Sequence, residues 1–227
     1  MRFEKQTVIR KVGINREMKG LLIAGASGHG KVIADIATKT KQYETILFLD
    51  DDKNIHEVMS FPVIGTIIPD MELFVQWFGH SNIEIIIAIG NSQIRMRKQQ
   101  MFEKTGMQIA TLIHPSAVIG QDVVIGAGTI VMANTVINSG TRIGKGCIIN
   151  TMSSVDHDNV IEDYVHISVG SHLAGTVSVG SHTWIGIGAI VSNNIKICKD
   201  CTIGAGAVVV KNISQKGVYI GIPAKPM

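Results

Sequence analysis

A histidine between two carboxylates is the most promising catalytic candidate in this sequence. His157 stands in the segment Val155-Asp156-His157-Asp158-Asn159. A carboxylate that is hydrogen-bonded to an imidazole fixes the tautomer of the ring and raises its basicity, and a general base needs such an arrangement. A solvated histidine in a turn is the simpler hypothesis for the same residues. No serine or cysteine shows the surroundings of an activated nucleophile, so a covalent enzyme intermediate is disfavoured.

Polar residues that suit a nucleotide follow three expected strands in the first half of the chain. These are Gly25-Ala26-Ser27-Gly28-His29-Gly30 after a strand at 19–24, Asp50-Asp51-Asp52 after a strand at 45–49, and Gly90-Asn91 after a strand at 83–89. Backbone N–H groups at a helix start can bind a phosphate, and a carboxylate after the second strand can accept a hydrogen bond from a ribose hydroxyl. The spacing G-x-x-G-x-G differs from G-x-G-x-x-G, so a redox dinucleotide is disfavoured. A glycine turn that merely lets the strand and the helix pack is the alternative.

The elements that would position these groups alternate between strands and helices. Helices are expected after the glycine turn, after Pro69 and at 93–105. The helix after Pro69 would place four apolar residues at helical spacing, namely Leu73, Phe74, Trp77 and Phe78. Such alternation predicts a small parallel βαβ sheet that is covered on both faces and binds ligands at the carboxyl ends of its strands. We assign this α/β domain to residues 19–112, after an N-terminal arm at 1–18.

The second half of the chain follows a six-residue repeat. Every sixth residue from Ile113 to Val209 is aliphatic, and most residues four places later are small or β-branched. An α-helix needs a period of about 3.6 residues and an isolated strand a period of about 2, so a register of six predicts a parallel β-helix. Three hexads make one coil, and residues eighteen apart stack in columns with coils about 4.8 Å apart. We place this β-helix of hexapeptide repeats at 113–214 and a C-terminal tail at 215–227.

The cysteines are not expected to form disulfides or to bind metal. Cys147 and Cys201 fall in the same inward column three coils apart, about 14 Å, which is beyond the reach of a disulfide. Cys198 and Cys201 form a lone CxxC within one strand and turn of the repeat. We therefore expect no metal.

The composition is typical of a soluble protein. Of 227 residues, 45% are hydrophobic and 17% charged, and no apolar run approaches the roughly 20 residues that cross a bilayer. No secretory signal is visible, so we expect a cytoplasmic protein without membrane insertion. The net charge of +3 owes much to basic residues among the first nineteen. No basic stripe with interleaved aromatic residues continues beyond them, and no nucleic-acid partner is expected.

Nine short segments resemble the hexapeptide-repeat acetyltransferases that act on sugar nucleotides and sialic acids. The bacterial UDP-4-amino-sugar N-acetyltransferases of the bacillosamine pathway are the most similar of these. The likeness extends from about residue 19 to the C-terminus. Its segments are Gly25–Gly30, Phe48–Asp51, Ala88–Asn91, Leu112–Ala117, Asn150–Thr151, Ser154–Val155, His166–Gly170, Ala174–Gly175 and Gly217–Lys225.

This resemblance implies a left-handed β-helix that forms a homotrimer. It implies that acetyl-CoA lies in the groove between neighbouring β-helices, that the α/β domain binds a UDP-amino sugar, and that an amine or hydroxyl attacks the thioester directly. Carried over by position, catalysis falls on His157 and Asp158. Acetyl-CoA contacts fall on His166, Gly175, Ile187 and Ala205. Contacts to the sugar nucleotide fall on Ser27, Gly28, His29, Asp50, Asp51 and Gly90.

Two positions depart from the pattern of that family. Its most similar members have Glu where Asp158 stands, so the arm that reaches the imidazole is shorter here. They have Gly where Ala205 stands, which affects the local contact to CoA.

The leading hypothesis is N-acetylation of the 4-amino group of a UDP-linked amino-dideoxy sugar for surface glycan or exopolysaccharide synthesis. O-acetylation of a sialic or related nonulosonic acid is the alternative within the same class. A zinc carbonic anhydrase shares the β-helix and would use His157, His166 and His172. A non-catalytic binder of sugar nucleotides is the remaining alternative.

Overall fold

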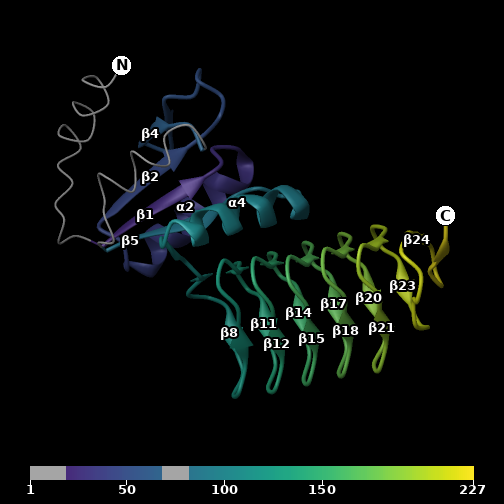
Figure 1. The fold of residues 1–227 in the computed structure, drawn as a ribbon. Coiled ribbons are helices and arrows are strands. Elements are labelled where there is room, and N and C mark those ends of the chain that lie inside the picture. Colours follow the sequence, from purple (N-terminus) through teal and green to yellow (C-terminus); the bar gives the residue numbers. More distant parts are fainter. Residues whose placement is uncertain (1–18, 68–81) are drawn as a thin grey trace. The chain divides into compact units, whose positions relative to one another are not determined.

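The computed structural model describes residues 19–67 and 82–227, and the chain divides into two compact units between Ala110 and Thr111 (Figure 1). The arm at 1–18 and the helix expected after Pro69 lie outside the described residues. Within the described ranges, no helix combines the length and the apolar character that crossing a membrane requires.

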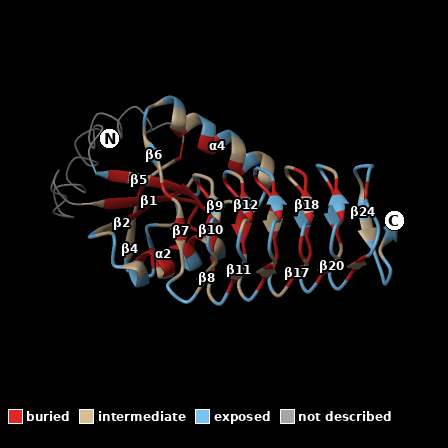
Figure 2. Ribbon diagram, turned by 90° about the horizontal axis from the view of Figure 1, so that it is seen from below, coloured by how far each residue is buried: buried red, intermediate tan, exposed pale blue. Residues whose placement is uncertain are grey.

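The first unit is built on a sheet with the strand order β3-β4-β2-β1-β5-β6. Its centre is parallel, with β1 (Gly20–Ala24) between β2 (Thr45–Leu49) and β5 (Ile83–Ile87). These strands are apolar runs, and β1 is buried throughout (Figure 2). The outer strands are β6 (Gln108–Ile109), β4 (Phe61–Gly65) and β3 (Glu57–Val58). The expected parallel sheet is confirmed, and the antiparallel pair of β3 and β4 is an addition to it.

Two helices cover opposite faces of this sheet. Helix α2 (Gly28–Thr40) packs so closely that a side chain on Gly30 would collide with the Gly25 carbonyl and lie 3.1 Å from Phe48. Helix α4 (Ser92–Lys104) places Phe102 in a buried cluster with Leu47, whose side chain points away from that of Phe48 because successive strand residues alternate.

The second unit is a left-handed parallel β-helix whose strands form three sheets, here called the first, second and third faces. The first face contains β7 (Leu112–Ile113), β10 (Ile130–Val131), β13 (Ile148–Ile149), β16 (His166–Ile167), β19 (Trp184–Ile185), β22 (Thr202–Ile203), β24 (Val218–Ile220) and the antiparallel β25 (Lys225–Pro226). The second contains β8 (Val118–Ile119), β11 (Val136–Ile137), β14 (Ser154–Val155), β17 (His172–Leu173), β20 (Ile190–Val191) and β23 (Val208–Val209). The third contains β9 (Val124–Ile125), β12 (Arg142–Ile143), β15 (Val160–Ile161), β18 (Ser178–Val179) and β21 (Lys196–Ile197).

Up to β20, every strand of the β-helix pairs with the strand eighteen residues further on, as the repeat predicts, whereas β22 pairs with β24 only sixteen residues further on. Ile149, for example, pairs with Ile167, and both are buried. The small column also points inward, and Thr129 and Thr141 donate hydrogen bonds of 2.7 Å to the carbonyl oxygens of Gly144 and Asp156. Buried hydroxyl groups therefore have partners, and the interior is otherwise aliphatic.

The turns between the faces form the corners of the prism. The turns from the first to the second face are called the first corner, and those from the second to the third face the second corner. In many of these turns the second residue has a positive φ. Asp158 is such a residue, with a φ of 57°. The corners thus project side chains outward at fixed positions of each coil.

Candidate active site

His157 and Asp158 form a hydrogen-bonded pair at the second corner, between β14 and β15. His157 Nδ1 lies 2.8 Å from Asp158 Oδ2. The pair is open to solvent, with 57% of the His157 side chain and 66% of the Asp158 side chain exposed. The backbone of Asp158 is fixed by its N–H, which donates to the Ser139 carbonyl one coil below at 3.1 Å. The shorter arm of aspartate therefore reaches the imidazole in this protein.

The carboxylates around His157 increase its affinity for a proton. The hydrogen bond to Asp158 is the main cause that raises the pKa of His157; desolvation opposes it, and the charges of Asp156 and Asp158 raise the pKa further. Asp156 is itself held ionised, because the Asn138 amide donates to its Oδ1 at 2.7 Å and the His157 N–H donates at 2.8 Å, and these bonds lower its pKa. The imidazole is thus poised to accept a proton at Nε2, the nitrogen that Asp158 leaves free.

Two glycines leave room for this pair. Gly175 lies one coil above His157, and a Cβ built on it would lie 2.5 Å from His157 Nε2. Gly140 lies one coil below Asp158, and a Cβ there would lie 2.6 Å from Asp158 Oδ1. Real Cβ atoms do not approach other atoms so closely, so both side chains occupy space that only glycine leaves open.

The N–H of Gly175 has no acceptor in the described part of the chain. At the equivalent place one coil below, the His157 N–H donates to the preceding side chain, that of Asp156. Gly175 is preceded by Ala174, which has no side-chain acceptor. A backbone donor without an acceptor in the described residues therefore belongs to the glycine that lies against His157 Nε2.

The other residues assigned to acetyl-CoA lie elsewhere on the prism. His166 is on the first face, where it stacks on Trp184 with ring centroids 5.4 Å apart and lies 3.2 Å from the Asn150 amide. Ile187, with 61% of its surface exposed, and Ala205 are at the first corner. One chain therefore brings His157 and Gly175 together at the second corner, whereas Ile187 and Ala205 lie at the first corner and His166 lies on the first face.

Residues assigned to the sugar nucleotide gather at the carboxyl ends of β1 and β2. Asp50 Oδ2 accepts a hydrogen bond from the Ala26 N–H at 2.6 Å, which ties the end of β2 to the glycine turn. Ser27 is the residue before α2, and the space around Gly28 is open, with no atom within 4 Å of a Cβ built there. The start of α2 is thus accessible to an anion.

The other three residues assigned to the sugar nucleotide are buried or bonded within the first unit: Asp51, His29 and Gly90. Asp51 accepts from the Ile67 N–H at 2.9 Å and lies 3.4 Å from Lys98 Nζ. Burial and the nearby charge of Arg95 lower the pKa of His29 to about 4, so the ring is neutral. The Gly90 carbonyl accepts from Arg95 Nη1 at 2.7 Å. Of this group, Asp51 alone has a largely exposed side chain.

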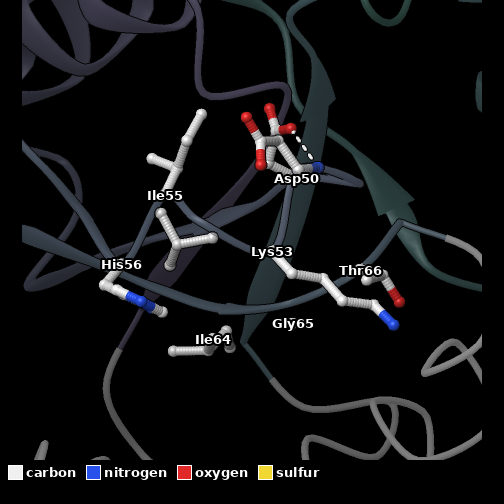
Figure 3. A pocket seen from close by; sticks show the side chains of 9 residues that line it. Asp50, Lys53, Ile55, His56, Ile64, Gly65 and Thr66 are labelled. Atoms are coloured by element: carbon white, nitrogen blue, oxygen red, sulfur yellow. Dashed lines mark hydrogen bonds between the residues drawn. The ribbon is translucent and has the colours of Figure 1, made fainter.

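A cavity of about 360 Å³ opens beside Asp50, at the carboxyl ends of β2 and β4 (Figure 3). Its lining residues are Asp50, Asp52, Lys53, Ile55, His56, Val63, Ile64, Gly65 and Thr66. Sequence reasoning found Asp50 and Asp52 but missed the others, since they belong to the loop before β3, to β4 and to the residue after β4.

Comparison with known proteins gives the family of the chain. Residues 20–102 match the family described as the PglD N-terminal domain. The acetyltransferase domain of PglB from Neisseria gonorrhoeae FA1090 is 37% identical, over 92% of this chain and 100% of that chain, with a TM-score of 0.86. PerB from Caulobacter crescentus, solved with CoA and GDP-perosamine, is 33% identical, over 92% and 97%, with a TM-score of 0.85. WeeI from Acinetobacter baumannii AYE is 28% identical, over 91% and 99%, with a TM-score of 0.81.

The chain belongs to the PglD family of hexapeptide-repeat sugar N-acetyltransferases. It is therefore an acetyltransferase. The PglB domain has also been solved with acetyl-CoA, so members of the PglD family bind this cofactor.

Three histidines considered as zinc ligands are distributed over the β-helix of this family member. His157 is at the second corner, His166 on the first face and His172 on the second face, where it lies 2.8 Å from Ser154 Oγ. Over residues 19–67 and 82–227, no three His, Cys, Asp or Glu residues are grouped as metal ligands. The two thiols of the CxxC are 3.5 Å apart and free.

Proposed function

We propose that this member of the PglD family transfers the acetyl group of acetyl-CoA to the 4-amino group of a UDP-linked amino-dideoxy sugar. The observation that carries the proposal is the 2.8 Å bond between His157 Nδ1 and Asp158 Oδ2, with Nε2 over Gly175. A tautomer with the proton on Nδ1 leaves Nε2 as the acceptor, and the Gly175 N–H, which has no acceptor within the described residues, belongs to the glycine against which Nε2 lies. A base and an oxyanion donor at one place are the two groups that attack of an amine on a thioester needs.

In the proposed reaction the sugar ammonium gives a proton to His157 Nε2, and the neutral amine attacks the carbonyl carbon of the thioester. The new C–N bond forms as the carbonyl electron pair moves onto oxygen, where the Gly175 N–H stabilises it. The C–S bond then breaks, and CoA leaves as a thiol with the second proton of the nitrogen. The proton held by His157 passes to solvent.

We propose a homotrimer because the residues assigned to the cofactor lie at two corners of one chain. The first and second corners are at opposite ends of the strands of the second face. If the first corner of one copy faces the second corner of the next, then Ile187 and Ala205 meet Gly175 and His157. Three such contacts close a ring. The second face also exposes apolar residues such as Val118 and Ile190, which an interface would cover.

The nucleotide is proposed to bind to the first unit. The start of α2 presents backbone N–H groups to open space and has no acidic residue in its first turn, so it suits a diphosphate. Asp50, which already accepts the Ala26 N–H, has lone pairs left for a ribose hydroxyl.

An assay of acetyl transfer tests this function directly. Purified protein is incubated with acetyl-CoA and a panel of UDP-linked 4-amino sugars, and the release of free thiol is followed. We expect turnover with at least one of them and none with sialic or nonulosonic acids. Turnover that is confined to the hydroxyl acceptors would overturn the proposal.

A GDP-linked amino sugar is the second candidate, because PerB, a similar protein, is bound to GDP-perosamine. The panel therefore includes it, and the higher kcat/KM identifies the nucleotide.

A further inference from the structure

Two cysteines of the β-helix, Cys198 and Cys201, bring their sulfur atoms close together. They flank the two-residue turn Lys199-Asp200 at the corner between the third and the first face, from β21 to β22. In a four-residue turn the first and last Cα atoms lie within about 7 Å, and disulfides join Cα atoms about 4.4–6.8 Å apart. The two Sγ atoms are 3.5 Å apart. The disulfide bond length of about 2.05 Å is therefore within reach of small rotations of the two side chains. The sequence alone predicts no disulfide here, because it does not give this distance.

Neighbouring segments fix the backbone of both cysteines but hold the thiol hydrogen of Cys201 only weakly. The Cys198 N–H donates to the Ile213 carbonyl at 2.8 Å, and the Cys201 N–H donates to Thr183 Oγ1 at 3.2 Å. Cys201 Sγ lies 3.6 Å from the Gln215 carbonyl oxygen, and a thiol is a weak donor. The backbone thus keeps the two sulfur atoms together, and removal of this thiol hydrogen breaks no strong hydrogen bond.

The two thiols differ in their access to solvent. Cys201 is 1% exposed, whereas Cys198 is half-buried. Burial, together with the hydrogen bond to Cys198, raises the pKa of Cys201 to about 12. Since the thiolate is the reactive form, Cys198 is the residue that meets an external reagent first. A thiol with a raised pKa is also a poor leaving group, so a disulfide to Cys201 resists reopening on that side. An accessible thiol beside a buried one is the arrangement of an attacking and a resolving cysteine.

We propose that Cys198 and Cys201 are an oxidation site, at which a small disulfide converts the two thiols into a reversible intramolecular disulfide. The Cys198 thiolate attacks one sulfur of the small disulfide, whose S–S bond breaks and releases a first thiolate. Cys201 then loses its proton and attacks the Cys198 sulfur, and the mixed disulfide breaks to release a second thiolate. The protein thiols lose two electrons, which reduce the small disulfide, and its two thiol products take up the two protons. The state of the pair thus follows the ratio of disulfide to thiol around the protein.

Mass spectrometry of the full chain provides the test. The protein is treated with oxidised glutathione at about pH 8, where a thiol with an ordinary pKa is partly ionised, and remaining thiols are then alkylated in denaturant. We expect the protein to lose the mass of two hydrogen atoms, and its reactive thiols to fall from three to one. Trypsin cuts after Lys199, between the two cysteines, so peptides 197–199 and 200–211 should be recovered as one disulfide-linked species. Dithiothreitol should restore all three thiols.

Three variants assign the steps of this reaction. Cys201→Ser should stop at the mixed disulfide and gain one glutathionyl group at Cys198, and Cys198→Ser should stay reduced because Cys201 is buried. Cys147→Ser is the matched control. Cys147 is buried in the same column as Cys201 but three coils away, so this variant should form the disulfide as the wild type does.

Two results with the folded wild type would overturn the inference. One is that all three thiols survive the treatment, and the other is that Cys198 keeps a glutathionyl group while Cys201 stays reduced. Neither result depends on acetyl transfer, so the oxidation site and the proposed function can fail separately.

Discussion

The His157 imidazole is held by contacts on two sides. Asp158 fixes one edge of the ring through a hydrogen bond, and the Cα of Gly175 lies against the other edge. Neither contact buries the ring, so its position depends on these neighbours and not on packing in a core. Small changes to them should therefore alter the rate with little effect on folding.

Gly175→Ala should displace the base. The added Cβ would lie 2.5 Å from Nε2, so the ring must rotate away from the position in which Asp158 and the oxyanion donor flank it. Gly175 has no positive φ, and alanine strains the backbone little. We expect kcat to fall about 10²-fold, as misplacement by about 1 Å does in other enzymes. Steady-state kinetics are compared with those of Gly217→Ala, whose Cβ has only an ordinary 3.6 Å contact to Tyr219. Equal kcat values for the two variants would contradict this role.

His157→Ala should lose the proton acceptor. Removal of a general base typically lowers kcat by about 10²–10⁴-fold. Binding of both substrates should remain, since the side chain is exposed and does not support the fold. Kinetics and a thermal melt are measured on the same sample. A folded variant with the kcat of the wild type at every pH would show that another group is the base.

Asp158→Asn should shift the pH dependence and reduce kcat less than His157→Ala does. The base works when it is unprotonated, so kcat/KM falls as the pH drops below the pKa of His157. The bond to Asp158 is the main cause that raises this pKa. Its loss should move the falling limb to lower pH, although the charge of Asp156 remains. The measurement is a profile of kcat/KM from about pH 5 to about pH 9. If the falling limb of the profile does not move, the limb reports the titration of a group other than His157.

The residues of the pair could be predicted because they are adjacent in the sequence. The register of eighteen also puts Gly175 in the column of His157. What the sequence could not give is the tilt of the ring, since this depends on the backbone of two turns and on the left-handed φ of Asp158. The register of eighteen likewise puts Trp184 in the column of His166 but does not predict that the indole stacks on the imidazole.

At the scale of elements, the coils are joined by buried polar side chains as well as by strand pairs. Asn159 is the largest polar member of the small inward column and is fully buried. Its amide nitrogen donates to the carbonyls of Asp156 at 2.6 Å and Ala174 at 3.1 Å, and its oxygen accepts the Val177 N–H at 2.6 Å. It thus ties the turn of His157 to the turn of Gly175.

Asn159→Ala should destabilise the β-helix. The change leaves the Val177 N–H without its partner in a dry interior, and two carbonyls lose a donor. We expect a loss of about 2–4 kcal/mol in the free energy of unfolding, because each buried group left unsatisfied costs about 1–3 kcal/mol. Denaturant unfolding is compared with Asn193→Ala, an exposed position that should change by less than about 0.5 kcal/mol. Equal stability of the two variants would refute the role of Asn159.

Regular elements were predictable and irregular ones were not. Long apolar runs gave β1, β2 and β5, and the unbroken period of six gave the β-helix. The hairpin of β3 and β4 was missed because its two turn residues, Met59 and Ser60, both have positive φ but carry no glycine or asparagine signature. Pro62 also argues against a strand, and it is tolerated here beside the sheet edge.

At the scale of the whole molecule, the separation of the two corners predicts that active sites are shared between subunits. His157→Ala removes a group of the second corner, and Ile187→Glu disrupts the first corner. Each variant alone should be nearly inactive. When the two are unfolded, mixed in equal amounts and refolded, hybrid trimers should regain about a quarter of the wild-type activity, because some interfaces then combine two intact corners. No recovery from a mixture that sediments as trimers would place the whole site within one chain.

The stacking of coils also limits how the length of such a chain can change during evolution. A gain or loss of six residues between His157 and Gly175 would turn every later coil by one face. The side chain above His157 would then come from a different corner, and the base would lose its neighbour. A gain of eighteen residues keeps all corners in line and adds one layer, yet inserted at this point it too would separate His157 from Gly175. We therefore expect natural variation in length to accumulate in whole layers beyond Gly175 or below Gly140, while the coils between them keep a constant length.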